Sequence, residues 1–165
     1  MFENIIKNVH NRYPLIHCIT NYVSINDCAN IVLACGGAPI MAEDINEVSQ
    51  ITSICQGLDI NIGMLNDNKL SSMLKAGATA NELGIPVILD PVGAGSSDYR
   101  IKAVQNLMSN VQFGVIRGNV SEIKAIAAKQ GIHNIAAGVY DTMQKDKSAM
   151  GVEAGIADKI TDDNI

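Results

Sequence analysis

Polar side chains stand next to small residues at the ends of four short apolar stretches of this sequence. The four polar ends are Thr20–Asn21, Asn61–Gly63, Asp90–Gly95 and Arg117–Asn119. The guanidinium of an arginine can pair with phosphate oxygens, and an aspartate in a loop can hold Mg²⁺ directly or through water. Asp, Asn and Gly also follow strands in many proteins as turn residues, so one such end means little. Four of them gathered at one place would indicate a site for phosphoryl chemistry.

The common nucleotide-binding motifs do not account for these residues. The P-loop pattern G-x-x-x-x-G-K-[ST] is absent from the sequence. The segment ITNYVSIN, which follows the first apolar stretch, has no glycine where a dinucleotide fingerprint needs three. Gly93-Ala94-Gly95 is only a G-x-G fragment. The sequence therefore favours neither a P-loop enzyme nor a dinucleotide-binding Rossmann domain.

The apolar stretches themselves predict buried strands separated by helices. The predicted strands are residues 15–19, 38–41, 58–62, 85–89 and 113–116. Two helical stripes lie between them, formed by Leu70, Met73, Leu74 and Gly77 and by Ile101, Val104, Leu107 and Met108. Alternating strands and helices predict an α/β fold with a mainly parallel sheet covered by helices. Such a sheet binds ligands at the carboxyl ends of its strands, which is where the four polar ends belong.

Size and charge exclude several classes of protein. The chain has 165 residues, 47% of them hydrophobic, which is enough for one domain with a real core. Its formal net charge is −5 and no segment concentrates Lys and Arg, so we expect no nucleic-acid partner. The N-terminal residues lack the basic start and apolar run of a secretory signal. The longest weakly polar run, residues 31–42, falls well short of the roughly 20 residues that span a membrane, so we expect no membrane segment.

The cysteines and histidines are scattered along the chain. The four cysteines stand at positions 18, 28, 35 and 55, and the three histidines at positions 10, 17 and 133. These spacings match neither a C-x-x-C redox pair nor a pair of zinc knuckles. They are typical of reduced thiols in a cytoplasmic protein.

Five segments, taken together and in order, resemble the hydroxyethylthiazole kinase family of thiamine salvage, which belongs to the ribokinase-like superfamily. The segments are HCITNYVSINDCAN (17–30), GGAPIMAED (36–44), LDINIGML (58–65), PVILDPVGAG (86–95) and VIRGNVSEI (115–123). The resemblance extends to about Gly155 and implies a three-layer ribokinase-like fold. It also implies ATP-dependent, Mg²⁺-dependent phosphorylation of the alcohol of 4-methyl-5-(2-hydroxyethyl)thiazole in the cytoplasm, by a homotrimer with its thiazole site between subunits.

Carried over position by position, the resemblance implies two groups of site residues. The thiazole-binding group is Asn21, Val23, Met41, Gly63 and Leu65. The group for ATP and Mg²⁺ is Arg117, Asn119, Asp90 and Glu122. In this second group, Arg117 would hold the ATP phosphates, while Asp90 and Glu122 would organise the magnesium and its waters.

Simpler structural roles remain open for several of these residues. Met41 lies in an apolar stretch and can be plain core. Asn21 can cap a helix that begins near Ser24, and Asp90 can accept hydrogen bonds from the amides of its own glycine-rich turn. Arg117 directly follows an apolar strand, so its charge needs either an anionic partner or a path to water.

Glu122 also has a structural alternative, because Asn119-Val120-Ser121-Glu122 has the form of a capping box. In that motif the N-cap side chain and the N3 side chain each accept a hydrogen bond from the other's backbone N–H. Gln serves at N3 as well as Glu does, so a change to Gln is expected to leave the helix nearly as stable.

The sequence departs from the family pattern after Gly155. Family kinases continue into a T-G-x-G-C turn that forms the anion hole for the transferred phosphate, and no such turn follows here. We therefore expect residues 1–165 to be a single incomplete ribokinase-like domain, truncated at the C-terminus, without the catalytic residues and inactive by itself. The alternative is a noncatalytic thiazole-binding or assembly module. Residues 130–165 are predicted to form a loop followed by a helix.

Overall fold

The fold is given by a computed structural model that describes residues 2–129 of the chain. The elements in chain order are α1 (Phe2–Arg12), β1 (Leu15–Ile19), α2 (Ile25–Ala34), β2 (Ala38–Ile40), α3 (Val48–Ser53), β3 (Gly57–Asn61), α4 (Asp67–Glu82), β4 (Val87–Asp90), α5 (Asp98–Asn110), β5 (Val115–Ile116) and α6 (Val120–Lys129). The five predicted strands agree with the observed ones to within two residues at each end. The loop and helix predicted for residues 130–165 lie outside the described residues.

The strands form one five-stranded parallel sheet in the order β2-β1-β3-β4-β5. The chain first moves outward from β1 to β2, then returns to the other side of β1 and adds β3, β4 and β5 in turn. The strand order therefore reverses between β1 and β3. In open parallel sheets, the crevice outside the carboxyl ends of the strands at this reversal is the usual place for a ligand.

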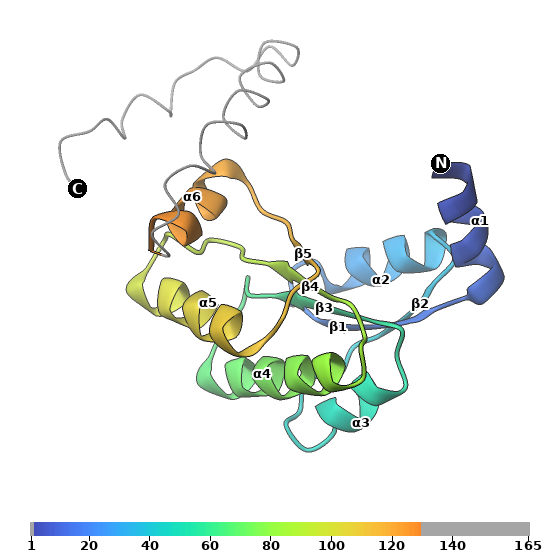
Figure 1. The fold of residues 1–165 in the computed structure, drawn as a ribbon, viewed down its shortest axis with the longest axis horizontal. Helices are drawn as coiled ribbons and strands as arrows, with labels where there is room; N and C mark the ends of the chain where they lie inside the picture. Colours follow the sequence, from blue (N-terminus) through green and yellow to red (C-terminus); the bar gives the residue numbers. More distant parts are fainter. Residues whose placement is uncertain (1, 130–165) are drawn as a thin grey trace, which may run out of the picture.

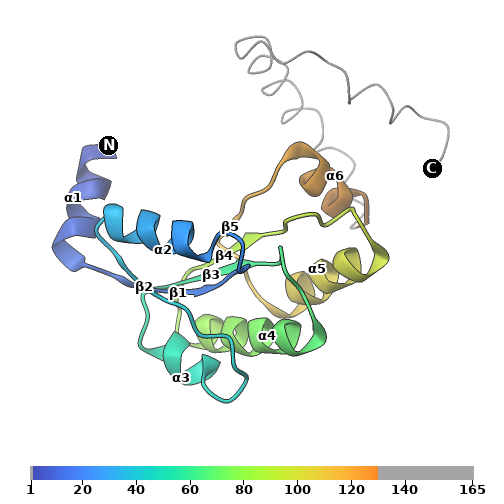
Figure 2. The same cartoon turned by 180° about the vertical axis from the view of Figure 1, so that it is seen from behind.

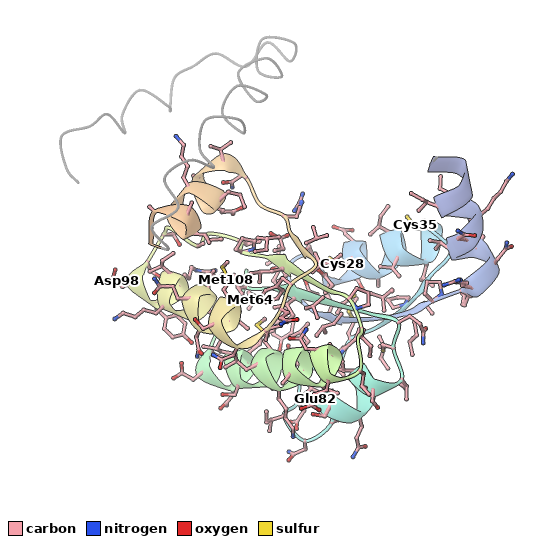
Figure 3. All side chains as sticks on the ribbon, viewed as in Figure 1. Cys28, Cys35, Met64, Glu82, Asp98 and Met108 are labelled. Atoms are coloured by element: carbon pink, nitrogen blue, oxygen red, sulfur yellow. The ribbon has the colours of Figure 1, made fainter. Side chains whose placement is uncertain are left out.

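Helices cover the sheet in layers, as the sequence predicts. Figure 1 shows α3, α4 and α5 on one face of the sheet and α2 on the other. Figure 2 shows the same arrangement from behind, with α1 and α6 toward opposite ends of the molecule. In Figure 3, Asp98 at the start of α5 and Glu82 at the end of α4 mark the carboxyl and amino edges of the sheet.

The main core lies between the sheet and the layer of α4 and α5. It is built from alternate residues of the strands and from the apolar stripes of the helices, among them Leu58, Ile60, Val87, Leu89, Met73, Ala76, Val104 and Leu107. The two predicted stripes thus both face the sheet. Gly77, in the α4 stripe, packs against Val111. A Cβ at position 77 would lie 2.5 Å from Val111 Cγ2, so only glycine permits this close approach.

The opposite face of the sheet is less covered. The strand registers place Cys18, Asp59, Ile88 and Val115 in one row on this face. Ile88 is 42% exposed and Val115 is 52% exposed. The pKa of Asp59 is raised from 3.8 to about 6, mainly by burial and also by nearby Asp90, while Arg117 acts in the opposite direction.

The remaining sequence expectations concern cysteines and membranes. All four cysteines are free thiols; Cys18 and Cys55 are buried, while Cys28 and Cys35 lie on and just after α2 (Figure 3). Among residues 2–129, no helix combines the length and the apolar character needed to cross a bilayer.

Candidate functional site

Four strand ends meet at the carboxyl edge of the sheet through a continuous chain of side-chain hydrogen bonds. Asn21, after β1, donates from Nδ2 to Asn61 Oδ1 over 3.2 Å. Asn61, the last residue of β3, donates from Nδ2 to Asp90 Oδ2 over 3.0 Å. Arg117, after β5, donates to the same Asp90 oxygen over 3.0 Å. We call Asn21, Asn61, Asp90 and Arg117 the edge network.

Asn21 has two roles, one at each end of its amide. Its Oδ1 accepts hydrogen bonds from the backbone N–H of Ser24, at 3.0 Å, and from the Ser24 hydroxyl, at 3.1 Å. Ser24 is the N-cap of α2, and its own side chain makes no capping hydrogen bond. Asn21 thus shapes the turn into α2, while its Nδ2 is directed to the edge network.

Asn61 is at the centre of the network and is only 8% exposed. Its Oδ1 also accepts the backbone N–H of Gly63 at 2.8 Å, which folds the chain tightly after β3. A Cβ on Gly63 would lie 2.9 Å from Asn61 Oδ1 and 3.0 Å from Asn21 Nδ2. Only glycine fits at position 63, because the side chains of Asn21 and Asn61 pack directly against its backbone.

Asp90 and Arg117 form an ion pair at the other end of the network. The Arg117 side chain is 77% exposed, whereas that of Asp90 is only 17% exposed. Arg117 therefore has both an anionic partner and a path to water. Its guanidinium donates to Asp90 Oδ2, the oxygen that also accepts the hydrogen bond from Asn61. The rest of the guanidinium is exposed and has the geometry to pair with a phosphate.

Glu122 forms the predicted capping box and a further contact that the sequence does not predict. Asn119 Oδ1 accepts the Glu122 N–H at 3.0 Å, and Glu122 Oε2 accepts the Asn119 N–H at 2.8 Å. Glu122 Oε1 accepts the N–H of Gly93, which lies in the turn after β4, at 2.9 Å. The sequence left open that Asp90 accepts hydrogen bonds from the amides of its own glycine-rich turn. In the structure, the Gly93 amide of that turn binds Glu122, and the Asp90 carboxylate accepts hydrogen bonds from Asn61 and Arg117.

Arg100, in the first turn of α5, was not among the predicted site residues. Its guanidinium donates to the carbonyl oxygens of Ile62 at 2.7 Å, Gly63 at 2.8 Å and Val92 at 2.9 Å. It thereby fastens the turn after β3 to the turn after β4. A signal in the sequence could have found Arg100. It lies in the first turn of a predicted helix that directly follows a glycine-rich turn, so its side chain can reach the backbone of the neighbouring loops.

A second group that the sequence did not indicate surrounds Lys69, in the first turn of α4. Lys69 is 5% exposed; its ammonium donates to the carbonyl oxygen of Thr20 and lies 2.7 Å from Glu43 Oε2. It also lies 4.6 Å from the centre of the Tyr22 ring, whose hydroxyl donates to Glu43. A lysine in a first helical turn ordinarily faces water, so only the tertiary structure identifies this one.

The structure brings the other predicted thiazole residues together only in part. Val23, in the turn before α2, is 88% exposed. Met41 directly follows β2 and is partly buried, outside the main core cluster. Leu65 is partly buried against the core after β3. Asn21 and Gly63 are the two members of this group that the edge network places side by side.

His17 has a structural role. It is fully buried in β1, with Nδ1 2.9 Å from Thr52 Oγ1 and Nε2 2.7 Å from the carbonyl oxygen of Ala42. Burial lowers the pKa of His17, which favours the neutral ring, while the hydrogen bond to Ala42 opposes this effect. The ring links β1 to α3 and to the segment after β2.

The acidic residues fit a cation shared with a phosphate better than a metal held by protein alone. Within residues 2–129, no group of three or more His, Cys, Asp and Glu could hold a metal ion. Mg²⁺ at phosphoryl-transfer sites commonly takes one or two carboxylates and completes its shell with phosphate oxygens and water. Asp90 fits such a role. Glu122 fits a supporting one, since each of its oxygens already accepts a backbone N–H.

The fold and the edge network together define a class: an α/β protein with a parallel sheet whose strand order reverses between β1 and β3, and with an arginine–carboxylate pair at the carboxyl edge of that sheet. The chain belongs to the hydroxyethylthiazole kinase family, whose model matches residues 6–161. This match confirms the resemblance read from the five sequence segments.

Individual relatives agree with the family match. The chain is 53% identical over all 165 residues to a hydroxyethylthiazole kinase of Clostridium acetobutylicum, covering 55% of that protein. It is 46% identical over 165 residues to one of Desulfovibrio desulfuricans, covering 52% of it. A solved structure of a Pyrococcus horikoshii hydroxyethylthiazole kinase matches with a TM-score of 0.77 at 38% identity, over 82% of this chain and 53% of that one. The chain thus spans about half the length of the curated relatives it matches.

Proposed function

We propose that this chain is part of an ATP-dependent kinase that phosphorylates the hydroxyl of 4-methyl-5-(2-hydroxyethyl)thiazole, in the biosynthesis and salvage of thiamine. The observation that carries the proposal is the edge network. It joins the side-chain amides of Asn21 and Asn61, at the reversal between β1 and β3, to the ion pair of Asp90 and Arg117 at the carboxyl ends of β4 and β5. A small neutral ring and a phosphate chain would therefore bind side by side, as transfer to an alcohol requires.

The thiazole subsite is assigned to the residues after β1, β2 and β3. These are Asn21, Val23, Met41, Gly63 and Leu65. The close packing of Gly63 against Asn21 and Asn61 supports this assignment, because it brings the residues after β1 and β3 together at the strand-order reversal. Met41 offers a polarisable side chain of the kind that packs on aromatic rings.

The phosphate subsite is assigned to the residues after β4 and β5. Arg117 would bind ATP phosphates with its exposed guanidinium, and Asn119 begins the helix whose N-terminus favours anions. Asp90 would hold Mg²⁺ together with phosphate oxygens and water, with Glu122 adding negative charge and holding the two turns together. When bound, Mg²⁺ supplies charge that offsets the negative charge of the phosphate being transferred.

The high exposure of residues in and next to the thiazole subsite supports a site completed by a neighbouring subunit of a homotrimer. Val23 is 88% exposed, Tyr22 is 55% exposed and Met64 is 41% exposed. Apolar side chains of this exposure are candidates for burial between copies of the chain. As an ATP-consuming kinase of a small metabolite, the protein would work in the cytoplasm.

Calorimetry and product analysis test the proposal. The binding partner is 4-methyl-5-(2-hydroxyethyl)thiazole, and 4-methyl-5-ethylthiazole, which lacks the hydroxyl, is the control. Catalysis is measured in an extended version, in which this chain is continued by the part of the Clostridium acetobutylicum relative that it does not cover. We expect both thiazoles to bind and only the alcohol to yield a phosphate ester with Mg²⁺ and ATP. An extended version that folds and trimerises but binds neither thiazole would overturn the proposal.

A further inference from the structure

The position of Asn61 leads to an inference that rests on the proposed function and deepens it. We propose that Asn61 is a positioning residue that couples the thiazole subsite to the phosphate subsite, so that nucleotide binding tightens thiazole binding. The sequence places Asn61 at one of the four polar strand ends but assigns it no ligand. It need not touch either ligand for this role, because it contacts one member of each subsite.

The amide of Asn61 has one possible orientation. Its Oδ1 accepts from Gly63 N at 2.8 Å and from Asn21 Nδ2 at 3.2 Å, and its Nδ2 donates to Asp90 Oδ2 at 3.0 Å. Turning the amide over would place its NH₂ against two donors and its oxygen against a carboxylate. The side chain is 8% exposed, so water offers little replacement for these bonds.

The coupling arises because Asn61 and Arg117 share one oxygen, Asp90 Oδ2. When a nucleotide phosphate attracts the Arg117 guanidinium, it draws that donor away from the shared oxygen. The charge-assisted bond from Asn61 to Asp90 then strengthens. Asn61 is held more firmly, and with it the Gly63 amide and the Asn21 side chain at the thiazole subsite. By reciprocity, thiazole would favour nucleotide binding to the same extent.

Asn61→Asp changes one group in this arrangement. The new carboxylate still accepts from Gly63 and Asn21, but it presents an oxygen instead of a donor to Asp90. The new carboxylate and Asp90 then present acceptors to each other, so the hydrogen bond that joins the two subsites is lost.

The experiment measures the thiazole Kd of the extended version with and without Mg²⁺ and a nonhydrolysable ATP analogue. In the unmodified protein we expect the nucleotide to tighten thiazole binding about fivefold or more. In Asn61→Asp we expect this factor to fall to near one. Asn106→Asp, on the exposed surface toward the amino-edge end of α5, adds the same charge far from the network and should leave the factor unchanged.

A second variant covers the case in which Asn61→Asp does not fold. Asn61→Asp/Asp90→Asn restores one amide facing one carboxylate, so stability should recover. Arg117 then lacks the shared oxygen, so the nucleotide effect should stay absent. A coupling factor equal to that of Asn106→Asp in either variant would make Asn61 merely structural. If the unmodified protein binds both ligands without coupling, this inference alone fails; if it binds no thiazole, the proposed function fails first.

Discussion

Glu122, in the first turn of α6, accepts the backbone N–H of Gly93, in the turn after β4, at 2.9 Å. The same carboxylate accepts the Asn119 N–H through its other oxygen at 2.8 Å. Gly93 has φ +66°, a conformation that favours glycine, so its amide can face the carboxylate. One nearly buried side chain thus holds together the two turns assigned to the phosphate subsite.

Glu122→Gln should destabilise the protein, because Gln has one acceptor oxygen for two backbone donors. The amide NH₂ must then face either Asn119 N–H or Gly93 N–H, at a cost of about 1 to 3 kcal/mol for the unsatisfied group. The sequence-based expectation of nearly unchanged stability considers only the contact of Glu122 with Asn119. Urea unfolding measures the loss, with Glu82→Gln at the exposed end of α4 as control. In the extended version, we also expect a raised Mg²⁺ requirement; equal unfolding curves for the two variants would contradict the double contact.

Lys69→Met should loosen the loops after β1 and β2. The change leaves the Thr20 carbonyl without its ammonium donor and Glu43 without its ion pair. Because Glu43 is partly solvated, we expect a loss of about 1 to 3 kcal/mol in the free energy of unfolding. Lys75→Met is a matched control, because Lys75 lies on the same helix but is exposed, and its ammonium donates to the Ile45 carbonyl. A larger loss for Lys75→Met than for Lys69→Met would refute the role of the buried ammonium.

Arg100→Lys should weaken thiazole binding as well as stability. A guanidinium reaches the carbonyls of Ile62, Gly63 and Val92 at once, whereas an ammonium is a point charge on a flexible stem. We expect about 1 to 2 kcal/mol lower stability from the lost hydrogen bonds. Calorimetry with the thiazole alcohol should show a higher Kd, with exposed Arg12→Lys as control. An unchanged Kd would show that the turn after β3 does not depend on this bridge.

Asp59→Asn should remove a pH-dependent cost. The pKa of Asp59 is raised from 3.8 to about 6, so between these values the folded state binds more protons than the unfolded state. Stability therefore falls as pH rises through this window, and the cost is complete above pH 6. Asp59→Asn should be more stable than the unmodified chain at pH 7.5, by about 1 to 2 kcal/mol after allowance for partial solvation. The difference should vanish near pH 4; a gain that persists there would point to another cause.

Local sequence patterns determined the elements and much of the candidate site. The strands are short apolar runs, and the stripes of α4 and α5 follow the helical period, so their positions depend on neighbouring residues alone. The Asn119–Glu122 capping box is likewise a contact over three residues and could be read directly. A parallel sheet then requires the polar strand ends to lie along one edge, which is why Asn21, Asp90 and Arg117 were found together.

The partners of individual side chains were decided only by the tertiary structure. Asn61 binds Asp90 because the register of β3 and β4 pairs these two residues, and a shift by one residue would turn them to different faces. Glu122 reaches Gly93, and Arg100 reaches Gly63, across loops separated by 29 and 37 residues. Lys69 is buried because Thr20, Tyr22 and Glu43 surround it from two other loops. Such contacts depend on strand register and loop path, and these are set by packing of the whole core, which no local pattern encodes.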